Sequence, residues 1–123
     1  MYNSILITGC AGFIGSHLCE YLLTNYPNSN IIGLDNLDPY YSIEKKKDNL
    51  KILQNFANFT FLLEDIRTTN CITEFKPELV IHLAALAGVR NSIMEPKRYA
   101  EVNIIGLIHL LEQFRNLPNL KNR

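Results

Sequence analysis

Short apolar segments alternate with longer segments of helical periodicity along this chain of 123 residues. The short segments have few polar positions, which is typical of strands buried on both faces of a parallel sheet. We expect such strands over residues 4–8, 30–34, 60–63 and 79–83. In the longer segments apolar residues recur at intervals of three and four, as on one buried face of a helix. This spacing predicts helices over residues 13–24, 43–56, 69–75 and 97–114, the last of them apolar on more than one face.

The regular alternation of strand and helix predicts the α/β fold class, a Rossmann-type parallel sheet with helices on both faces. Right-handed crossover connections then place the strands in the order 3-2-1-4. In such sheets ligands bind at the carboxyl ends of the strands, where the strand order reverses. We therefore expect the binding site beside the ends of the first and fourth strands.

Three glycines at intervals of three residues, Gly9, Gly12 and Gly15, join the first strand to the first helix. This pattern favours a dinucleotide-binding turn, in which Gly9 allows the tight turn, Gly12 makes room for phosphates and Gly15 lets the helix pack closely. The helix would then direct its N-terminal amides and positive dipole end at a pyrophosphate. Glycines after a strand can also form a simple turn, so the motif alone leaves both interpretations open.

Asp35 changes that balance, because it ends the second strand twenty residues after Gly15. At this distance a carboxylate accepts hydrogen bonds from an adenosine ribose. The carboxylate favours NAD over NADP, since it would repel a 2′-phosphate and no arginine stands beside it. The nearest basic residues are Lys45–Lys47, which we interpret as a solvated helix face.

The composition bears on which partners the protein binds and on whether it holds a metal or a disulfide. Twelve basic and twelve acidic residues cancel, so net charge favours neither nucleic acid nor an anionic membrane as a partner. The three cysteines form no CxxC pair and no histidine cluster accompanies them, so we expect reduced thiols and no metal site. His82 is interpreted as a packed histidine. The apolar segments are too short to span a membrane and no signal-peptide pattern is present, which predicts a cytoplasmic location and a small-molecule ligand.

Four ordered blocks of this sequence resemble the NAD-dependent epimerase/dehydratase family, the extended short-chain dehydrogenases. The blocks are residues 8–18, residues 33–37 with Tyr40-Tyr41, Asp65-Ile66, and residues 82–90. The resemblance covers essentially the whole chain and is strongest to the UDP-glucuronate 4-epimerase group. Leu86 is a departure, because that group tends to carry glutamine at this position.

The resemblance implies NAD as the cofactor and gives each matching position a role. The positions that match the pyrophosphate site are Gly9, Gly12, Phe13, Ile14 and Gly15. Those that match the adenosine site are Asp35, Asn36, Asp65 and Ile66. Those on the nicotinamide side are Leu83, Ala84, Ala85 and Ala87, and Asn103 would lie close to the cofactor. Asp65 could equally begin the turn after its strand. The resemblance places Arg90 near the cofactor phosphates or the carboxylate of a sugar nucleotide.

The resemblance also implies that the catalytic Tyr and Lys, four residues apart, follow a fifth strand that lies beyond residue 123. We therefore expect a partial NAD-binding domain of a nucleotide-sugar 4-epimerase. This part would have no catalytic residue, no substrate domain and no turnover by itself. The complete protein would bind a UDP-sugar. Tyr41 and Lys45 share the catalytic spacing but follow the second strand, so we predict no catalytic role for them.

Two alternative functions stay open. One is a non-enzymatic or vestigial nucleotide-binding module, and the other is a fragment of a sugar-nucleotide 4,6-dehydratase. The helix expected over residues 97–114 has more apolar surface than one sheet can cover, which predicts contact with a further segment or with a second copy in a homodimer.

Overall fold

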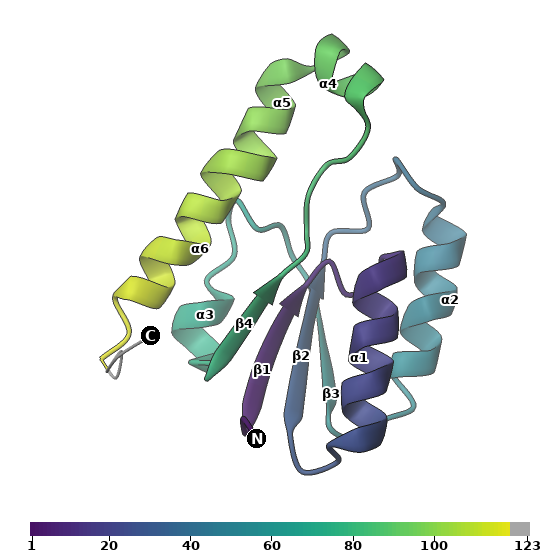
Figure 1. Ribbon diagram of the computed structural model, residues 1–123, viewed down its shortest axis with the longest axis vertical. Helices are drawn as coiled ribbons and strands as arrows, with labels where there is room; N and C mark the ends of the chain where they lie inside the picture. Colours follow the sequence, from purple (N-terminus) through teal and green to yellow (C-terminus); the bar gives the residue numbers. More distant parts are fainter. Residues whose placement is uncertain (119–123) are drawn as a thin grey trace. The chain divides into compact units, whose positions relative to one another are not determined.

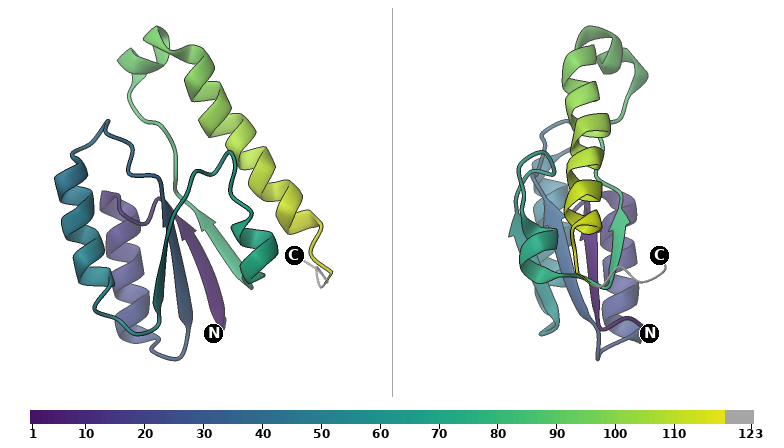
Figure 2. Two further views of the ribbon diagram at one scale, coloured as in Figure 1. Left: turned by 180° about the vertical axis from the view of Figure 1, so that it is seen from behind. Right: turned by 90° about the vertical axis from the view of Figure 1, so that its left-hand side faces the viewer.

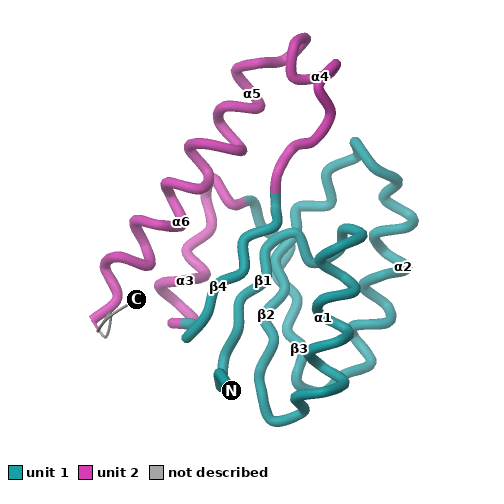
Figure 3. Tube along the Cα trace, in the orientation of Figure 1, with its two compact units in different colours: residues 1–65, 77–84 teal, residues 66–76, 85–123 magenta. Residues whose placement is uncertain are grey.

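The computed structural model describes residues 1–118, which form two compact units (Figure 3). Unit 1 comprises Met1–Asp65 and Pro77–Ala84, and unit 2 comprises Ile66–Lys76 and the chain from Ala85 onward. The chain therefore passes from one unit to the other at residues 65–66, 76–77 and 84–85. Two of these crossings divide neighbouring residues of the predicted cofactor site, Asp65 from Ile66 and Ala84 from Ala85.

Unit 1 is built on a four-stranded parallel sheet in the order β3-β2-β1-β4 (Figure 1). Its strands are β1 (Ser4–Thr8), β2 (Asn30–Asp35), β3 (Phe59–Leu63) and β4 (Leu79–His82). In the register Thr8 is paired with Leu34 and with His82, and Asp35 is paired with Leu63. The carboxyl ends of all four strands thus share one edge, and the predicted strand order is confirmed.

The helices α1 (Phe13–Asn25) and α2 (Ile43–Leu53) lie side by side and pack on one face of this sheet (Figures 1 and 2). Alternate residues of the central strands meet the buried faces of both helices, and each buried aliphatic side chain contributes about 1.5–3 kcal/mol. The buried members of this core are Ile5, Ile7, Cys10, Ala11, Cys19, Leu22, Leu23, Ile31, Leu50 and Leu53. Ser42 caps α2 by accepting a hydrogen bond from the amide of Lys45.

Unit 2 contains α3 (Cys71–Phe75), α4 (Val89–Met94), α5 (Pro96–Ala100), the π-helical segment η1 (Glu101–Ile105) and α6 (Gly106–Arg115). The helix expected over residues 97–114 is therefore present as three consecutive helical segments from Pro96 to Arg115, with a π-helical turn that the sequence pattern does not indicate. Within η1 the amide of Gly106 donates to the carbonyl of Glu101, five residues back, so the helix takes an extra residue into one turn. His109 and Gln113 of α6 both bond the carbonyl oxygen of Thr69, at 2.8 Å each, which joins α6 to the segment before α3.

Arg90 lies on α4, a helix that the sequence pattern does not indicate. This helix has six residues, none of them buried, and its N-cap Gly88 has no side chain with which to cap it. Its apolar residues Val89, Ile93 and Met94 are exposed, so no buried face generates a helical pattern in the sequence. The helices expected over residues 43–56 and 69–75 are shorter in the structure, as their bounds above show.

Cys10, Cys19 and Cys71 are buried thiols that form no disulfide within residues 1–118, as expected. Burial raises the pKa of Cys19 to about 12 and raises that of Cys10 as well, so neither is a thiolate at neutral pH. Within residues 1–118 no group of His, Cys, Asp or Glu side chains is arranged to hold a metal ion. No helix in that range has both the length and the hydropathy of a membrane span. Residues 119–123, the end of the segment before the expected fifth strand, lie outside the described residues.

Candidate functional site

The turn at Gly9 is held between β2 and the residue that follows β4. Its amide donates to the carbonyl of Leu34 at 2.7 Å, and its φ is +75°, a conformation that side chains disfavour. A Cβ at Gly9 would lie 2.9 Å from the amide nitrogen of Ala84. Glycine is thus required here by the protein's own backbone, in addition to the close ligand approach that the sequence suggests.

Gly15 has the role that its spacing predicts, which is close packing of α1 against the turn. A Cβ at this position would lie 2.0 Å from the carbonyl oxygen of Gly9, far inside van der Waals contact. Gly12 differs, because a Cβ there would have that same oxygen as its nearest neighbour, at 3.4 Å, and the φ of Gly12 is −73°. The fold therefore requires glycine at positions 9 and 15, whereas a methyl group at position 12 would make only an ordinary van der Waals contact.

The N-terminus of α1 presents amides that the helix does not use. The helical hydrogen bonds begin with Ser16, whose amide donates to Gly12 at 2.9 Å, so the amides of Phe13, Ile14 and Gly15 precede them. The side chains of Phe13 and Ile14 are exposed. Unused amides together with the positive end of the helix dipole favour an anion at this position.

Asp35, at the end of β2, is buried with its carboxylate directed at the same turn. One oxygen accepts the amide of Ala11 at 3.1 Å and the other accepts the amide of Leu37 at 2.8 Å. A carboxylate has about four acceptor positions, so two remain for hydroxyl donors of a ligand. The acidic residue and the glycine turn, 24 residues apart in sequence, are therefore parts of one structure.

Lys46 corrects the interpretation of Lys45–Lys47 as a solvated face. Lys45 and Lys47 are exposed, but Lys46 is 9% exposed and its ammonium lies 3.9 Å from an oxygen of Asp35. The same ammonium donates to the carbonyl oxygen of Asp38 at 3.0 Å. The signal was present in the sequence, because Lys46 lies four residues before Leu50 on the buried face of α2.

Asn36 and Asp65 follow the neighbouring strands β2 and β3 and approach each other at the shared edge. The side-chain amide of Asn36 donates to the carboxylate of Asp65 at 3.5 Å, and its oxygen accepts the amide of Asp38. Two residues predicted to contact the adenosine part of the cofactor are thus brought together.

Thr8, which the sequence analysis did not single out, organises the carboxyl end of β4. Its hydroxyl accepts the amides of Leu83 and Ala84, both at 3.1 Å, and lies 2.6 Å from Nδ1 of His82. Since the oxygen already accepts two amides, its hydrogen is directed at an unprotonated Nδ1. Burial lowers the pKa of His82, which favours that neutral ring. His82 is a packed, satisfied histidine, as predicted.

The predicted site residues Ile66, Ala85, Ala87, Arg90 and Asn103 belong to unit 2. The side chain of Asn103 accepts the amide of Leu86 at 2.8 Å and donates to its carbonyl at 2.9 Å, so both of its polar groups are occupied by the backbone. The hydroxyl of Tyr99 donates to the carbonyl of Ala87 at 2.6 Å. Within unit 2, Asn103 therefore holds the segment after β4 in place.

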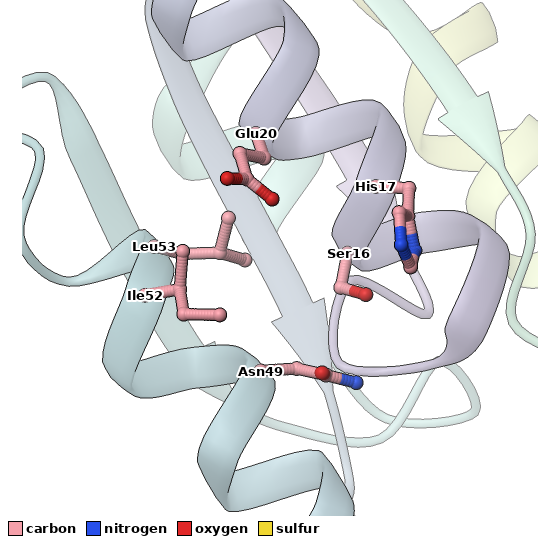
Figure 4. Close-up of a pocket in the computed structure, with 6 residues that line it drawn as sticks. All are labelled: Ser16, His17, Glu20, Asn49, Ile52 and Leu53. Carbon is pink, nitrogen blue, oxygen red and sulfur yellow. The ribbon is translucent and has the colours of Figure 1, made fainter.

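A small pocket of about 60 Å³ lies between α1 and α2 (Figure 4). Two or so water molecules would fill this volume, so it cannot hold a nucleotide. Asn49, which reaches it from α2, donates to the carbonyl oxygen of Ala11 at 2.9 Å and so ties α2 to the glycine turn. The lining residues are Ser16, His17, Glu20, Asn49, Ile52 and Leu53.

Tyr41 and Lys45 do not lie on one helical face, although they are four residues apart. Tyr41 precedes the cap residue Ser42, whereas Lys45 lies in the first turn of α2, and both side chains are exposed. The spacing therefore does not create the helical pair that the catalytic motif requires.

Comparison with known proteins identifies relatives of the chain along almost its whole length. Residues 6–123 match the family model described as GDP-mannose 4,6 dehydratase. A probable UDP-glucuronate 4-epimerase of Rhizobium meliloti is 40% identical over 111 residues, which cover 87% of this chain and 32% of the relative.

Solved structures give the same result. The UDP-glucuronic acid 4-epimerase of Bacillus cereus, in complex with UDP-glucuronic acid and NAD, superposes with a TM-score of 0.86 at 36% identity, over 93% of this chain and 37% of that one. A dTDP-glucose 4,6-dehydratase of Streptomyces venezuelae with NAD bound superposes with a TM-score of 0.77 at 30% identity, over 89% of this chain and 35% of that one. The chain thus spans about a third of the length of the relatives it matches.

We expect Gly15→Ala to destabilise unit 1 by about 1–3 kcal/mol or more, because a methyl group 2.0 Å from the Gly9 carbonyl oxygen must displace α1. Gly12→Ala is the matched control, because its φ is ordinary and its methyl group would make only an ordinary contact, and it should cost less than about 1 kcal/mol as a weaker N-cap. Urea unfolding followed by circular dichroism measures both. Equal losses in the two variants would contradict this account of the turn.

His82 predicts a pH dependence of stability. Its folded pKa is lowered by burial below an unfolded value of about 6.5, so its contribution is fully present above that pH and is lost as the pH falls towards the folded pKa. The free energy of unfolding should therefore decline less between pH 7.5 and pH 5 in His82→Gln than in the parent chain. Urea titrations at both pH values measure this, and identical declines in the two proteins would refute it.

Proposed function

Because this chain belongs to the GDP-mannose 4,6 dehydratase family, we propose that residues 1–123 form the NAD-binding part of a nucleotide-sugar 4-epimerase of the UDP-glucuronate type. The solved relative of that type is the Bacillus cereus enzyme, crystallised with UDP-glucuronic acid and NAD. The epimerase activity belongs to the complete protein, and the proposed share of this chain is to bind and orient the cofactor.

The observation that carries this proposal is the hydrogen bond from the amide of Ala11, inside the glycine turn, to the carboxylate of Asp35. It sets the group suited to a ribose next to the amides suited to a pyrophosphate. The spacing between a ribose and its phosphates in a dinucleotide calls for this arrangement. A glycine turn with only a structural role has no need of a buried carboxylate beside it.

The residues present fit NAD. The amides of Phe13 and Ile14 would face the pyrophosphate, the two remaining acceptor positions of Asp35 would take ribose hydroxyls, and Asp65 with Asn36 would border the adenine. Leu83 and Ala84, after β4, would border the nicotinamide, and within unit 2 Asn103 holds the backbone of Leu86. When bound, NAD supplies the redox chemistry of epimerisation.

Arg90 is the residue we propose for the anionic part of a substrate. Its guanidinium is exposed on the short helix α4, directly after the segment assigned to the nicotinamide side. A planar cation there suits the carboxylate or the phosphates of a UDP-sugar.

A sugar-nucleotide 4,6-dehydratase is the second candidate. It is favoured by the description of the family model and by the Streptomyces venezuelae structure. Both candidates use the same NAD site in this chain, so the choice between them concerns the reaction of the complete protein.

We also propose a homodimer through the α5–α6 region. Apolar side chains are exposed there, with Ile104 at 58% and Leu111 at 56%, and such a patch favours association. Sedimentation velocity would show a concentration-dependent dimer that Leu111→Glu shifts towards monomer. A parent chain that stays monomeric at high concentration would reject this proposal.

The proposed function predicts saturable NAD binding that weakens about tenfold or more in Asp35→Ala, since charge-assisted hydrogen bonds to the ribose contribute about 1.5–3 kcal/mol. NADP should bind the parent chain more weakly than NAD, because its 2′-phosphate meets a carboxylate. Titration calorimetry measures both affinities. Asp48→Asn is the matched control, because Asp48 is an exposed carboxylate on α2 and its substitution should leave the affinity unchanged.

The thermal stability of Asp35→Ala is measured alongside, because that change also removes the acceptor of two backbone amides. NAD binding that is unaffected in a folded Asp35→Ala variant, or absent from the folded parent chain, would exclude the proposed site.

A further inference from the structure

We propose that Lys46 is a specificity-determining residue. Its ammonium lies at the ribose end of the site, where the carboxylate of Asp35 offsets its charge. On this proposal the preference for NAD over NADP depends on the Asp35–Lys46 pair, because removal of the carboxylate's charge leaves an ammonium free to bind a 2′-phosphate. The inference rests on the proposed function, since it concerns the same cofactor site.

Lys46 is buried to an extent that is unusual for a lysine. Lysine is seldom buried without a partner, because desolvating an ammonium is costly. Lys46 is nevertheless 9% exposed, while its neighbours Lys45 and Lys47 on the same helix are exposed. It also lies near the positive N-terminal end of α2, where the helix dipole opposes a cation. Its position therefore needs a compensating interaction.

Asp35 supplies that interaction only in part. The ammonium is 3.9 Å from the nearer oxygen of Asp35, a distance for an ion pair rather than a hydrogen bond. The hydrogen bond of this ammonium within residues 1–118 is to the carbonyl oxygen of Asp38, at 3.0 Å. The same oxygen of Asp35 accepts the amide of Leu37 at 2.8 Å, so the carboxylate is fixed by the backbone and is not drawn to the lysine.

An ammonium has three donors, and a single carbonyl oxygen uses one of them. The carboxylate of Asp35, 3.9 Å away, is the charged group paired with this ammonium. If that charge is removed and the backbone stays in place, a phosphate dianion becomes the chemically matched partner, and the ammonium needs no further desolvation to bind it. Lys46 therefore determines what the site accepts once Asp35 is neutral.

The test is a double-mutant cycle read as NAD and NADP affinities by titration calorimetry. Asp35→Asn removes the charge and retains one acceptor oxygen for the backbone amides. We expect it to raise NADP affinity about ten- to one-hundredfold, the range of one or two charge-assisted hydrogen bonds. Asp35→Asn with Lys46→Met should lose this gain, and Asp35→Asn with Lys46→Arg should keep most of it.

Asp35→Ser replaces Asp35→Asn if the latter is not folded by circular dichroism, and the same two changes at Lys46 are combined with it. An equal rise in NADP affinity with and without Lys46 would overturn the proposal, because removal of the repulsion between Asp35 and the 2′-phosphate would then explain the whole rise. The proposal would also be overturned if a folded Asp35 variant still binds NAD and its NADP affinity does not rise. A folded parent chain that does not bind NAD is a different failure, that of the proposed function.

Discussion

The contact between the turn at Gly9 and the first turn of α1 is the constraint on which the rest of unit 1 depends. Position 15 has no room for a methyl group, since it faces the carbonyl oxygen of Gly9, and position 9 faces the backbone of Ala84. The amide of Gly9 meanwhile bonds β2 through Leu34. Segments near residues 9, 34 and 84 therefore meet within a few ångströms, and the N-terminal amides of α1 come to the edge where all four strands end.

Two buried polar side chains, Thr8 and Asp35, hold the loops at the carboxyl ends of the strands by hydrogen bonds. They therefore have a structural role, and Asp35 has a candidate functional role as well. Thr8 accepts the amides of Leu83 and Ala84, and Asp35 accepts the amides of Ala11 and Leu37. A buried polar group is tolerated only when it is hydrogen-bonded, and each of these two side chains is satisfied by two backbone amides. The loops that would contact a cofactor are thus shaped by the residues at the strand ends.

The charges at the end of β2 are not those of an isolated carboxylate. Lys46 stands beside Asp35 at a distance where Coulomb attraction is strong in a buried site and no hydrogen bond forms. The charges of Asp35 and Lys46 therefore offset each other before any ligand arrives, and the carboxylate still offers acceptor positions to ribose hydroxyls. A carboxylate with no cation nearby, as the linear sequence suggested, would have a more negative potential.

The strand order, the glycine turn and the position of Asp35 could all be predicted from the sequence, because they follow from apolar runs, the handedness of crossover connections, glycine spacing and the residue at a strand end. It did not reveal α4, whose six residues bury nothing, or the π segment, which depends on one residue inserted into a helical turn. Only the folded structure shows that Thr8 holds the loop after β4, that Asn103 holds Leu86, and that the ammonium of Lys46 lies beside Asp35. Each of these joins residues far apart in sequence, and only the packing of a folded chain determines which distant polar groups must satisfy one another.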